Sequence, residues 1–423
     1  MPIVLSNATV PILGAVDVGV VGQMGAAAPI GAVALGAVIL STLYWIFGFL
    51  RMGTVGLVGQ AEGAGDRAEG SAWLTRALVV ALVAGVLLII LQPLIIWSAL
   101  QLAPASPEVE GLARQYLMIR IWTAPAAIAL FALTGWLVAM ERTAGVFWVQ
   151  LVMNSINIVL DLLFVLVFDW GVPGVAVATV IAELTGAALA LWFCRSAFAQ
   201  PDWRDWPRIF DRAKLIRMAV LNRDILLRSA MLMIIFSSFV FIGARFGDVT
   251  LAANEVLIQF MYITAYAMDG FAFAAETLIA RAVGRGDRAG VRRSALLTSV
   301  WGLVVCVTMA AGFAVSGGWI IDVMAKDPDV QFVAREFLPY MVVAPLIGCA
   351  AWMLDGIFIG ATRSKDMRDM MALSFVLYWA AIVVLLPIMG NHGLWLALLL
   401  SFLARGVTLA VRYPALERHI HAA

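Results

Sequence analysis

The chain has 423 residues, of which 63% are hydrophobic and only 13% are charged, and its mean hydropathy is +0.97. Soluble domains are typically about half apolar and about one quarter charged, so this composition excludes a soluble globular protein. The formal net charge of +1 provides no overall attraction for nucleic acid or for strongly acidic partners. We therefore expect an integral membrane protein without a nucleic-acid partner.

Apolar runs recur along the whole chain, and as helices they are long enough to cross a hydrocarbon layer of about 30 Å. The runs lack the in–out alternation of a membrane β-barrel. The first run has no basic segment before it, which favours a spanning helix over a cleaved signal peptide. In chain order, the twelve predicted spans are residues 2–22, 29–50, 74–99, 115–140, 145–168, 173–194, 223–244, 250–280, 294–316, 335–360, 368–389 and 392–412.

Basic residues lie mainly on one side of these spans. If the N-terminus is placed inside and each Lys or Arg is assigned to its nearest loop, 23 of the 28 basic residues belong to the inner side. Cytoplasmic loops carry such an excess, so both termini are predicted to be cytoplasmic. The same assignment puts Arg120 in an outer loop and places Arg228 and Arg405 on the inner side.

The two halves of the chain are similar to one another. GQAEGAGDRAEG (59–70) matches ARAVGRGDRAGV (280–291) at an offset of 221, and GWLVAMERTAG (135–145) matches GIFIGATRSKD (356–366) at the same offset. A parallel repeat of a six-helix unit fits this pattern, so we predict an all-α membrane protein of two pseudo-symmetric six-helix bundles. The predicted parts are an N-terminal lobe over 1–197, a cytoplasmic or interfacial connection over 198–222, and a C-terminal lobe over 223–423.

Motifs of soluble enzymes are scarce. No lysine follows a glycine, so there is no Walker A motif, and the three histidines form no HExxH zinc motif. Any uphill transport would therefore draw its energy from an ion gradient or from a partner. Two pseudo-equivalent bundles favour alternating access to a cavity between lobes.

Polar residues inside the predicted spans are the candidates for function, because an ionised carboxylate near the centre of a spanning helix costs about 2.5–3.5 kcal/mol on insertion scales. The stretch NSINIVLD (154–161) places two amides and a carboxylate on one helical face. The first and sixth spans add further polar residues, and we expect one cluster from the three helices. The candidates in the N-terminal lobe are Asp17, Asn154, Asn157, Asp161, Thr179 and Glu183.

Residue types alone leave the role of this cluster open. Asn and Thr side chains often form interhelical hydrogen bonds that only hold membrane helices together. Alternatively, low dielectric or a neighbouring carboxylate raises the pKa of a carboxyl group, so that it can bind and release a proton near neutral pH. Oxygen ligands also suit a hard cation, so proton binding and sodium binding both remain open.

The second half carries two weaker candidates. Tyr262, Tyr266 and Asp269 share a stripe of the eighth span, which is either a wall that binds organic cations through aromatic faces or a packed helix end. Asp355 in the tenth span either braces the turn that follows or takes part in transport.

Several longer motifs are specific in combination. They are PILGAVDVGVVGQMG near the start, NRDILLR after the connection, and LAANEVLIQF, AYAMDGFAFAAE and LDGIFIGATR in the second half. Together they resemble the DinF-like branch of the multidrug and toxic compound extrusion (MATE) family over essentially the whole chain. The resemblance implies two bundles around a V-shaped cavity. It also implies antiport of protons or sodium ions against organic, often cationic or amphipathic, drugs, with no cofactor besides the coupling ion.

The resemblance also implies a site. The helix-1 aspartate of the branch matches Asp17, its helix-5 Asn-x-x-x-Asp pair matches Asn157 and Asp161, and its helix-6 threonine matches Thr179. These residues are then expected to couple proton or sodium movement to drug efflux, in a monomer in the lipid bilayer of a bacterial inner membrane. The expected cavity-lining residues are Asn154, Glu183, Tyr262, Tyr266 and Asp269.

Two other functions remain open. A flippase for a lipid-linked precursor, found in the same superfamily, needs a cationic cavity for pyrophosphate, whereas the clear charges within the spans are acidic and the arginines cluster in inner loops. An intramembrane enzyme could use Asp17 and Asp161 as an acid–base dyad. Such an enzyme, however, gives no reason for a duplicated six-helix unit.

Overall fold

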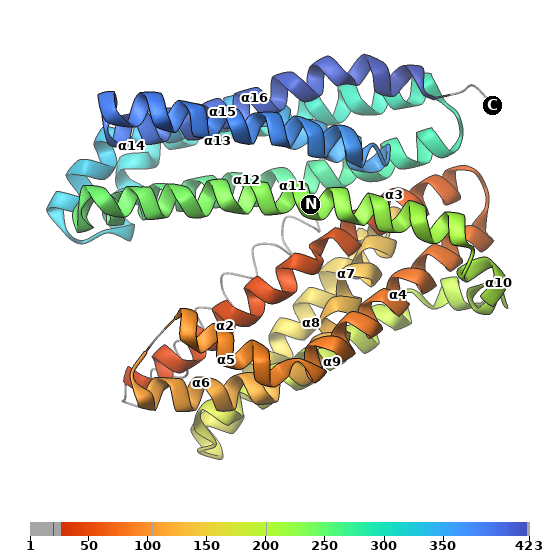
Figure 1. Ribbon diagram of the computed structural model, residues 1–423, viewed down its shortest axis with the longest axis horizontal. Helices are drawn as coiled ribbons and strands as arrows, with labels where there is room; N and C mark the ends of the chain where they lie inside the picture. Colours follow the sequence, from red (N-terminus) through yellow and green to blue (C-terminus); the bar gives the residue numbers. More distant parts are fainter. Residues whose placement is uncertain (1–19, 21–26, 104, 200, 421–423) are drawn as a thin grey trace. The chain divides into compact units, whose positions relative to one another are not determined.

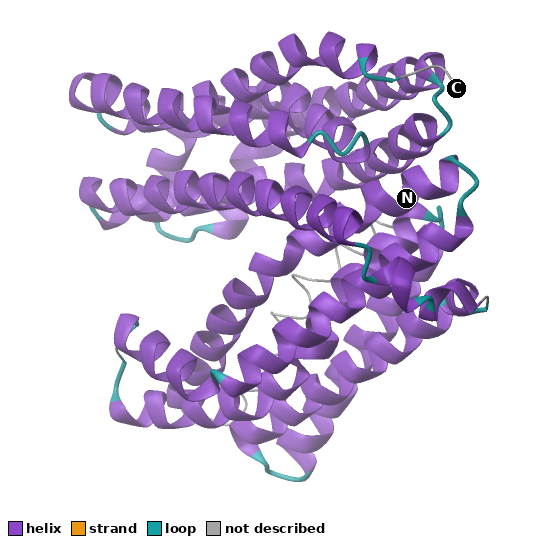
Figure 2. Ribbon diagram, turned by 45° about the vertical axis from the view of Figure 1, so that its right-hand side comes forward, coloured by secondary structure: helices purple, strands orange, loops and turns teal. Residues whose placement is uncertain are grey.

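The computed structural model describes residue 20 and residues 27–103, 105–199 and 201–420, and all regular secondary structure among them is helical (Figures 1 and 2). The α-helices are α2 (Ala27–Trp45), α3 (Phe49–Gly63), α4 (Arg67–Ile90), α5 (Gln92–Leu102), α6 (Pro107–Arg120), α7 (Ala124–Ala139), α8 (Thr143–Asp161), α9 (Gly171–Phe193), α10 (Trp206–Ile209), α11 (Arg212–Gly243), α12 (Asp248–Gly284), α13 (Arg288–Met324), α14 (Pro328–Gly360), α15 (Ser364–Met389) and α16 (Asn391–Arg418). The short or irregular helices are η1 (Ile46–Gly48), η2 (Ile121–Thr123), η3 (Leu162–Val167), η4 (Arg195–Phe198), η5 (Pro201–Arg204) and η6 (Ala244–Phe246).

Eleven helical segments in the described ranges are long and apolar enough to cross a membrane. Each overlaps one of the second to twelfth predicted spans, most of them with longer bounds than predicted, so the expected all-α membrane fold is confirmed. The longest, α12 and α13, have 37 residues each, well beyond the roughly 20 that a bilayer requires. The first predicted span, residues 2–22, lies outside the described residues apart from Val20.

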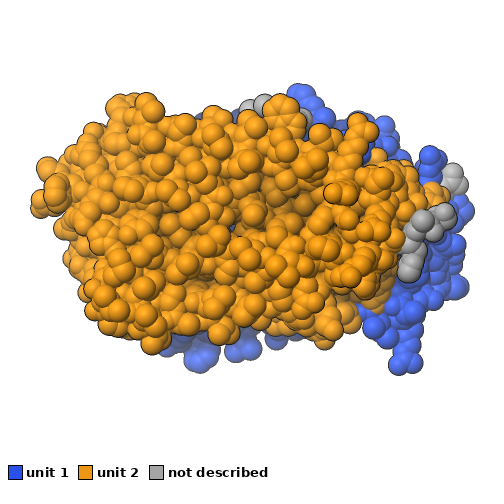
Figure 3. All heavy atoms as spheres, turned by 90° about the horizontal axis from the view of Figure 1, so that it is seen from above, with its two compact units in different colours: residues 1–58, 66–216 blue, residues 59–65, 217–423 orange. Residues whose placement is uncertain are grey.

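The chain divides into two compact units, which Figure 3 shows in different colours. One unit comprises residues 1–58 and 66–216, and the other comprises residues 59–65 and 217–423. In the first unit, α4 packs against α7, α8 against α9, and α2 against α6. In the second, α14 packs against α12, α13 and α16, and α15 packs against α16.

The turns between helices repeat at the same offset of 221 as the sequence motifs. The left-handed backbone positions Gly65, Glu141 and Asp169 recur as Gly286, Thr362 and Gly390. After the first of these turns in each half, an aspartate caps the next helix: Asp66 accepts from the Glu69 N–H (2.9 Å) and Asp287 from the Gly290 N–H (2.7 Å). The shared Gly-Asp pair thus ends one helix and begins the next, which explains why this motif occurs in both halves.

A buried amide pair ties α12 to α16 in the second unit. Asn254 Nδ2 donates to Asn391 Oδ1 (2.9 Å), and Asn391 Nδ2 donates back to Asn254 Oδ1 (3.0 Å). Asn254 Oδ1 also accepts the indole N–H of Trp395 at 2.9 Å. Polar side chains commonly join membrane helices in this way.

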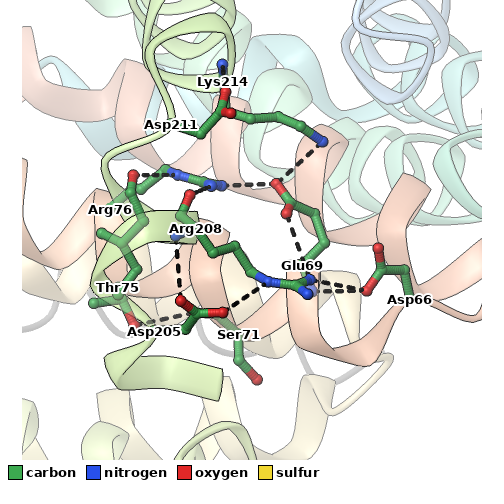
Figure 4. Close-up of polar contacts among 10 residues, drawn as sticks. Asp66, Glu69, Ser71, Thr75, Arg76, Asp205, Arg208, Asp211 and Lys214 are labelled. Atoms are coloured by element: carbon green, nitrogen blue, oxygen red, sulfur yellow. Dashed lines mark hydrogen bonds and ion pairs between the residues drawn. The ribbon is translucent and has the colours of Figure 1, made fainter. Parts of the chain in front are cut away.

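The connection between the two halves is fastened to α4 (Figure 4). Arg76 is 1% exposed and donates from Nε to the carbonyl of Ile209 (2.9 Å) and from Nη2 to the carbonyl of Arg208 (2.5 Å). Its Nη1 donates to Glu69 Oε1 at 2.8 Å, and the same carboxylate oxygen lies 3.4 Å from Lys214 Nζ. The connection is therefore held by the hydrogen bonds of the buried Arg76 to two of its carbonyls and by the contact between Lys214 and Glu69.

Candidate functional site

The polar stripe of α8 ends at a completely buried carboxylate. Asp161 is the last residue of α8 and has 0% exposed surface, and Asn157 is 1% exposed. One turn apart, the two side chains meet, because Asn157 Nδ2 donates to Asp161 Oδ2 at 3.0 Å. The next residues form the π-helical segment η3, where the Phe168 N–H bonds to the Leu163 carbonyl five residues back (3.0 Å). Such segments are rare and occur frequently at functional sites.

Helix α9 adds a hydroxyl group to this pair. Asn157 Nδ2 also donates to Thr179 Oγ1 at 3.3 Å, and Thr179 Oγ1 donates to the Val175 carbonyl at 2.9 Å. A single amide nitrogen therefore bridges a carboxylate of α8 and a hydroxyl of α9. The structure thus places three of the four predicted coupling residues, Asn157, Asp161 and Thr179, in one cluster.

The chemistry of this cluster suits a proton or a hard cation. Asn157 Oδ1 is buried and has no hydrogen-bond partner among the described residues, although buried polar atoms are normally paired. The described part of the chain contains no group of three His, Cys, Asp or Glu side chains that could hold a metal ion. A bound ion would therefore depend on amide and hydroxyl oxygens as well as on the carboxylate.

Asp17 is the fourth predicted member, and it lies outside the described residues. Its position relative to Asp161 therefore stays a prediction. Asn154 lies further along the same stripe, where its Oδ1 accepts from Gln150 Nε2 at 3.3 Å.

Glu183 forms a charged contact that the sequence reasoning missed. Its carboxylate lies 3.0 Å from Arg120 Nη1 and accepts from Thr123 Oγ1 at 2.5 Å. Arg120 is 7% exposed and belongs to α6, so the expectation that it lies in an outer loop was wrong. An arginine inside the apolar run LMIRIWT needs a buried partner, and Glu183 was a candidate for that partner.

The candidates in the second unit lie in two different settings. Tyr262 and Tyr266 are 43% and 38% exposed on α12, and Asp269 on the same face is half-buried. A cavity-lining role for this stripe stays a prediction.

Asp355 is buried and pairs with an arginine. It accepts a hydrogen bond from Arg228 Nη2, and Arg405 Nε lies 3.9 Å from the same carboxylate oxygen. Both arginines are buried within helices, so assigning them to loops was wrong. The charge argument against a flippase depended on that assignment and therefore no longer holds.

Spanning helices, an internal duplication and a buried polar cluster together define a polytopic membrane protein of the transporter class. The chain belongs to the MatE family, whose family model matches residues 2–163 and 225–386. The two matches fall in the two halves, as the sequence repeat predicts. The resemblance to the MATE family is therefore confirmed, and because the family comprises transporters, the chain is a transporter rather than an enzyme.

Two curated relatives cover nearly the whole chain. DNA damage-inducible protein F of Escherichia coli (strain K12) is 36% identical over 419 residues, which span 97% of this chain and 89% of that protein. The probable multidrug resistance protein NorM of Rhizobium meliloti (strain 1021) is 27% identical over 450 residues, which span 96% of this chain and 90% of the relative.

Solved structures show the same fold. The Vibrio cholerae MATE transporter VcmN in the bent form matches with a TM-score of 0.88 at 18% identity, over 99% of this chain and 95% of that one. A MATE structure in the bent conformation matches with a TM-score of 0.90 at 16% identity, with the same coverage.

Proposed function

We propose that this chain is a secondary active multidrug efflux antiporter that exchanges protons or sodium ions for small organic compounds, mainly cationic or amphipathic ones. The observation that carries the proposal is the completely buried Asp161 carboxylate, joined through Asn157 to Thr179. The names of the relatives support drug export over lipid flipping, since one is called a probable multidrug resistance protein.

The buried cluster gives proton binding a structural consequence. An ionised carboxylate is costly in a low-dielectric interior, and taking up a proton removes that cost. An ionised Asp161 can only accept hydrogen bonds, whereas a protonated one can also donate. Asn157 Oδ1, which has no partner among the described residues, and Thr179 Oγ1 are the nearby acceptors of this set. Proton uptake therefore rearranges the hydrogen bonds that join α8 to α9.

The proposal includes the setting of the protein. A bacterial inner membrane with both termini in the cytoplasm agrees with the excess of basic residues on one side of the spans. We infer that the protein acts as a monomer and alternates the access of its cavity between the two sides. It uses no cofactor besides the coupling ion.

The test is fluorescent-cation efflux in proteoliposomes, with a proton gradient or a sodium gradient imposed separately. Wild type is compared with Asp161→Asn and with the matched control Asp169→Asn. Asp169 is an exposed residue of the α8–α9 turn whose positive φ of 55° asparagine tolerates. We expect gradient-driven efflux to be lost in Asp161→Asn and in Asp17→Asn, and to be retained in Asp169→Asn.

The gradient that drives efflux identifies the coupling ion. Efflux driven by protons alone makes the cluster a proton site, and efflux driven by sodium alone makes it a cation site. Unimpaired efflux in Asp161→Asn would refute the coupling role, and the absence of efflux under both gradients would refute the antiporter itself.

A further inference from the structure

The second unit buries two arginines that share one carboxylate. Arg228 on α11 and Arg405 on α16 are 7% and 3% exposed, and Asp355 on α14 is 6% exposed. Arg228 Nη2 donates to Asp355 Oδ2, and Arg405 Nε lies 3.9 Å from that same oxygen. Because arginine stays protonated in proteins, two positive charges face a single negative charge in the interior of this unit.

Each of these two side chains has a buried hydrogen-bond donor without a partner among the described residues. A guanidinium group carries five N–H donors. The Nε atoms of Arg228 and Arg405 are both buried without a hydrogen-bond partner among the described residues. Asp355 is the one carboxylate that pairs with either guanidinium within that part of the chain.

Arg76 of the first unit shows how this chain satisfies a buried arginine elsewhere. Three of its nitrogen atoms donate at 2.9 Å or less, to the Glu69 carboxylate and to two backbone carbonyls. A buried charge without compensation costs several kcal/mol, and each buried donor without an acceptor adds to that cost. With only the Asp355 carboxylate between them, Arg228 and Arg405 therefore lack a second acceptor that carries negative charge.

We propose that Arg228 and Arg405 form a binding site for a small oxyanion, a phosphate or carboxylate group, inside the second unit. Guanidinium groups bind such groups through charge-assisted and often bidentate hydrogen bonds. A singly charged oxyanion balances the excess charge and fills the vacant donors. Asp355 holds the two guanidiniums together and, through its own charge, limits the affinity.

A cavity of about 430 Å³ lies next to α11 in the same unit. One face of α11 and the turn between α14 and α15 line it, and Arg217 and Lys365 are among the lining residues. Asp224 also lines it, but its charge is met by Arg368 Nη1 at 2.8 Å. Arg228 follows Asp224 by one turn on the same helical face, so the site begins one turn beyond the cavity.

The experiment measures binding of radiolabelled inorganic phosphate to the purified full chain in phosphatidylcholine nanodiscs. Chloride keeps the ionic strength constant, and no gradient is applied, so the result does not depend on the proposed transport function. We expect saturable binding to wild type, at least tenfold weaker binding to Arg405→Met, and intermediate binding to Arg405→Lys. The matched control is Arg335→Met, which removes an exposed arginine paired with Asp322 in the same unit.

Asp355→Asn separates a ligand site from a merely structural ion pair. If the two arginines form an anion site, removing the competing Asp355 carboxylate should tighten phosphate binding about tenfold or more. If the three side chains serve only packing, the substitution should not tighten phosphate binding. Absence of saturable binding to wild type, unchanged affinity in Arg405→Met, or weaker affinity in Asp355→Asn would each overturn the proposal. If Arg405→Met does not fold, the wild-type isotherm and Asp355→Asn decide the outcome.

Phosphatidylglycerol added to the nanodiscs identifies the source of the oxyanion. Loss of free-phosphate binding in the presence of this anionic lipid assigns the site to a lipid headgroup. Unchanged binding assigns it to a soluble oxyanion. Both results support the site, whereas displacement of phosphate by chloride at equal concentration would refute its preference for oxyanions.

Discussion

Replacing Arg76 with alanine should release the connection from α4. The substitution removes the partner of the Glu69 carboxylate and the donors to the carbonyls of Arg208 and Ile209. Breaking a buried ion pair by removing one partner costs about 3–5 kcal/mol. Glu69 keeps Lys214 at 3.4 Å, which argues for the lower end of that range.

About 3 kcal/mol corresponds to roughly a hundredfold larger population of the open connection, because each 1.4 kcal/mol is about a factor of ten. Tryptic cleavage measures this population, because the connection contains several Arg and Lys residues. The cleavage rate is proportional to the open population when opening and closing are fast. The measurement is the initial rate of tryptic cleavage between residues 195 and 214 in detergent micelles.

The control is Arg67→Ala, which removes an exposed arginine from the start of the same helix. We expect that control to be cleaved at the wild-type rate and Glu69→Gln, which keeps an oxygen acceptor for Arg76, to show a smaller increase than Arg76→Ala. If Arg76→Ala is cleaved no faster than wild type, Arg76 does not hold the connection to α4.

Asn254→Ala should lower the thermal unfolding midpoint in detergent more than Asn391→Ala, because Asn254 also accepts the indole N–H of Trp395. Interhelical hydrogen bonds in membranes are worth about 0.6 kcal/mol each. Equal or reversed shifts in the midpoint would contradict this ranking. Cys194 has no exposed surface, and burial raises the pKa of its thiol to about 12, so its alkylation at pH 8 should be much slower in the folded protein than in denaturant. Equal rates in the two states would contradict the buried position. Gly85→Leu should cost about 1–3 kcal/mol through overpacking, because even a Cβ atom at this position would clash with the backbone N and Cα of Pro125 in α7. The yield of monodisperse protein measures this, and Gly111→Ala, where the added Cβ meets nothing within 4 Å, should match wild type.

The all-helical membrane fold and part of the polar cluster could be predicted from sequence because they depend on short-range periodicity. The contact between Asn157 and Asp161 is an i, i+4 pair within one helix, so spacing alone brings the side chains together. The contact to Thr179 depends on how α8 packs against α9; the polar residues of the spans predicted a shared cluster, but not this particular contact. The partner of Glu183 could not be assigned in either way.

The buried arginines show where sequence reasoning failed. Assigning each basic residue to its nearest loop assumes that helices end at the membrane surface, but α11 and α16 have 32 and 28 residues. From the sequence alone, an arginine in the buried part of such a long helix cannot be distinguished from one in the part that extends beyond the membrane. The pairing of Arg228 with Asp355 joins residues 127 positions apart, and no local pattern encodes it.

The short segment of residues 59–65 belongs to the second unit although it comes from the first half of the sequence. Gln60 Nε2 donates there to the Gly360 carbonyl (3.1 Å) and to Thr362 Oγ1 (3.0 Å), and its Oε1 accepts from Arg217 Nη2 (2.8 Å). The duplicated halves are therefore no longer structurally independent, because the second unit includes a segment of the first half. A second half made on its own, from Arg217 onward, lacks the amide that donates to its Gly360 carbonyl, so the second copy completes its hydrogen bonds only when it is fused to the first.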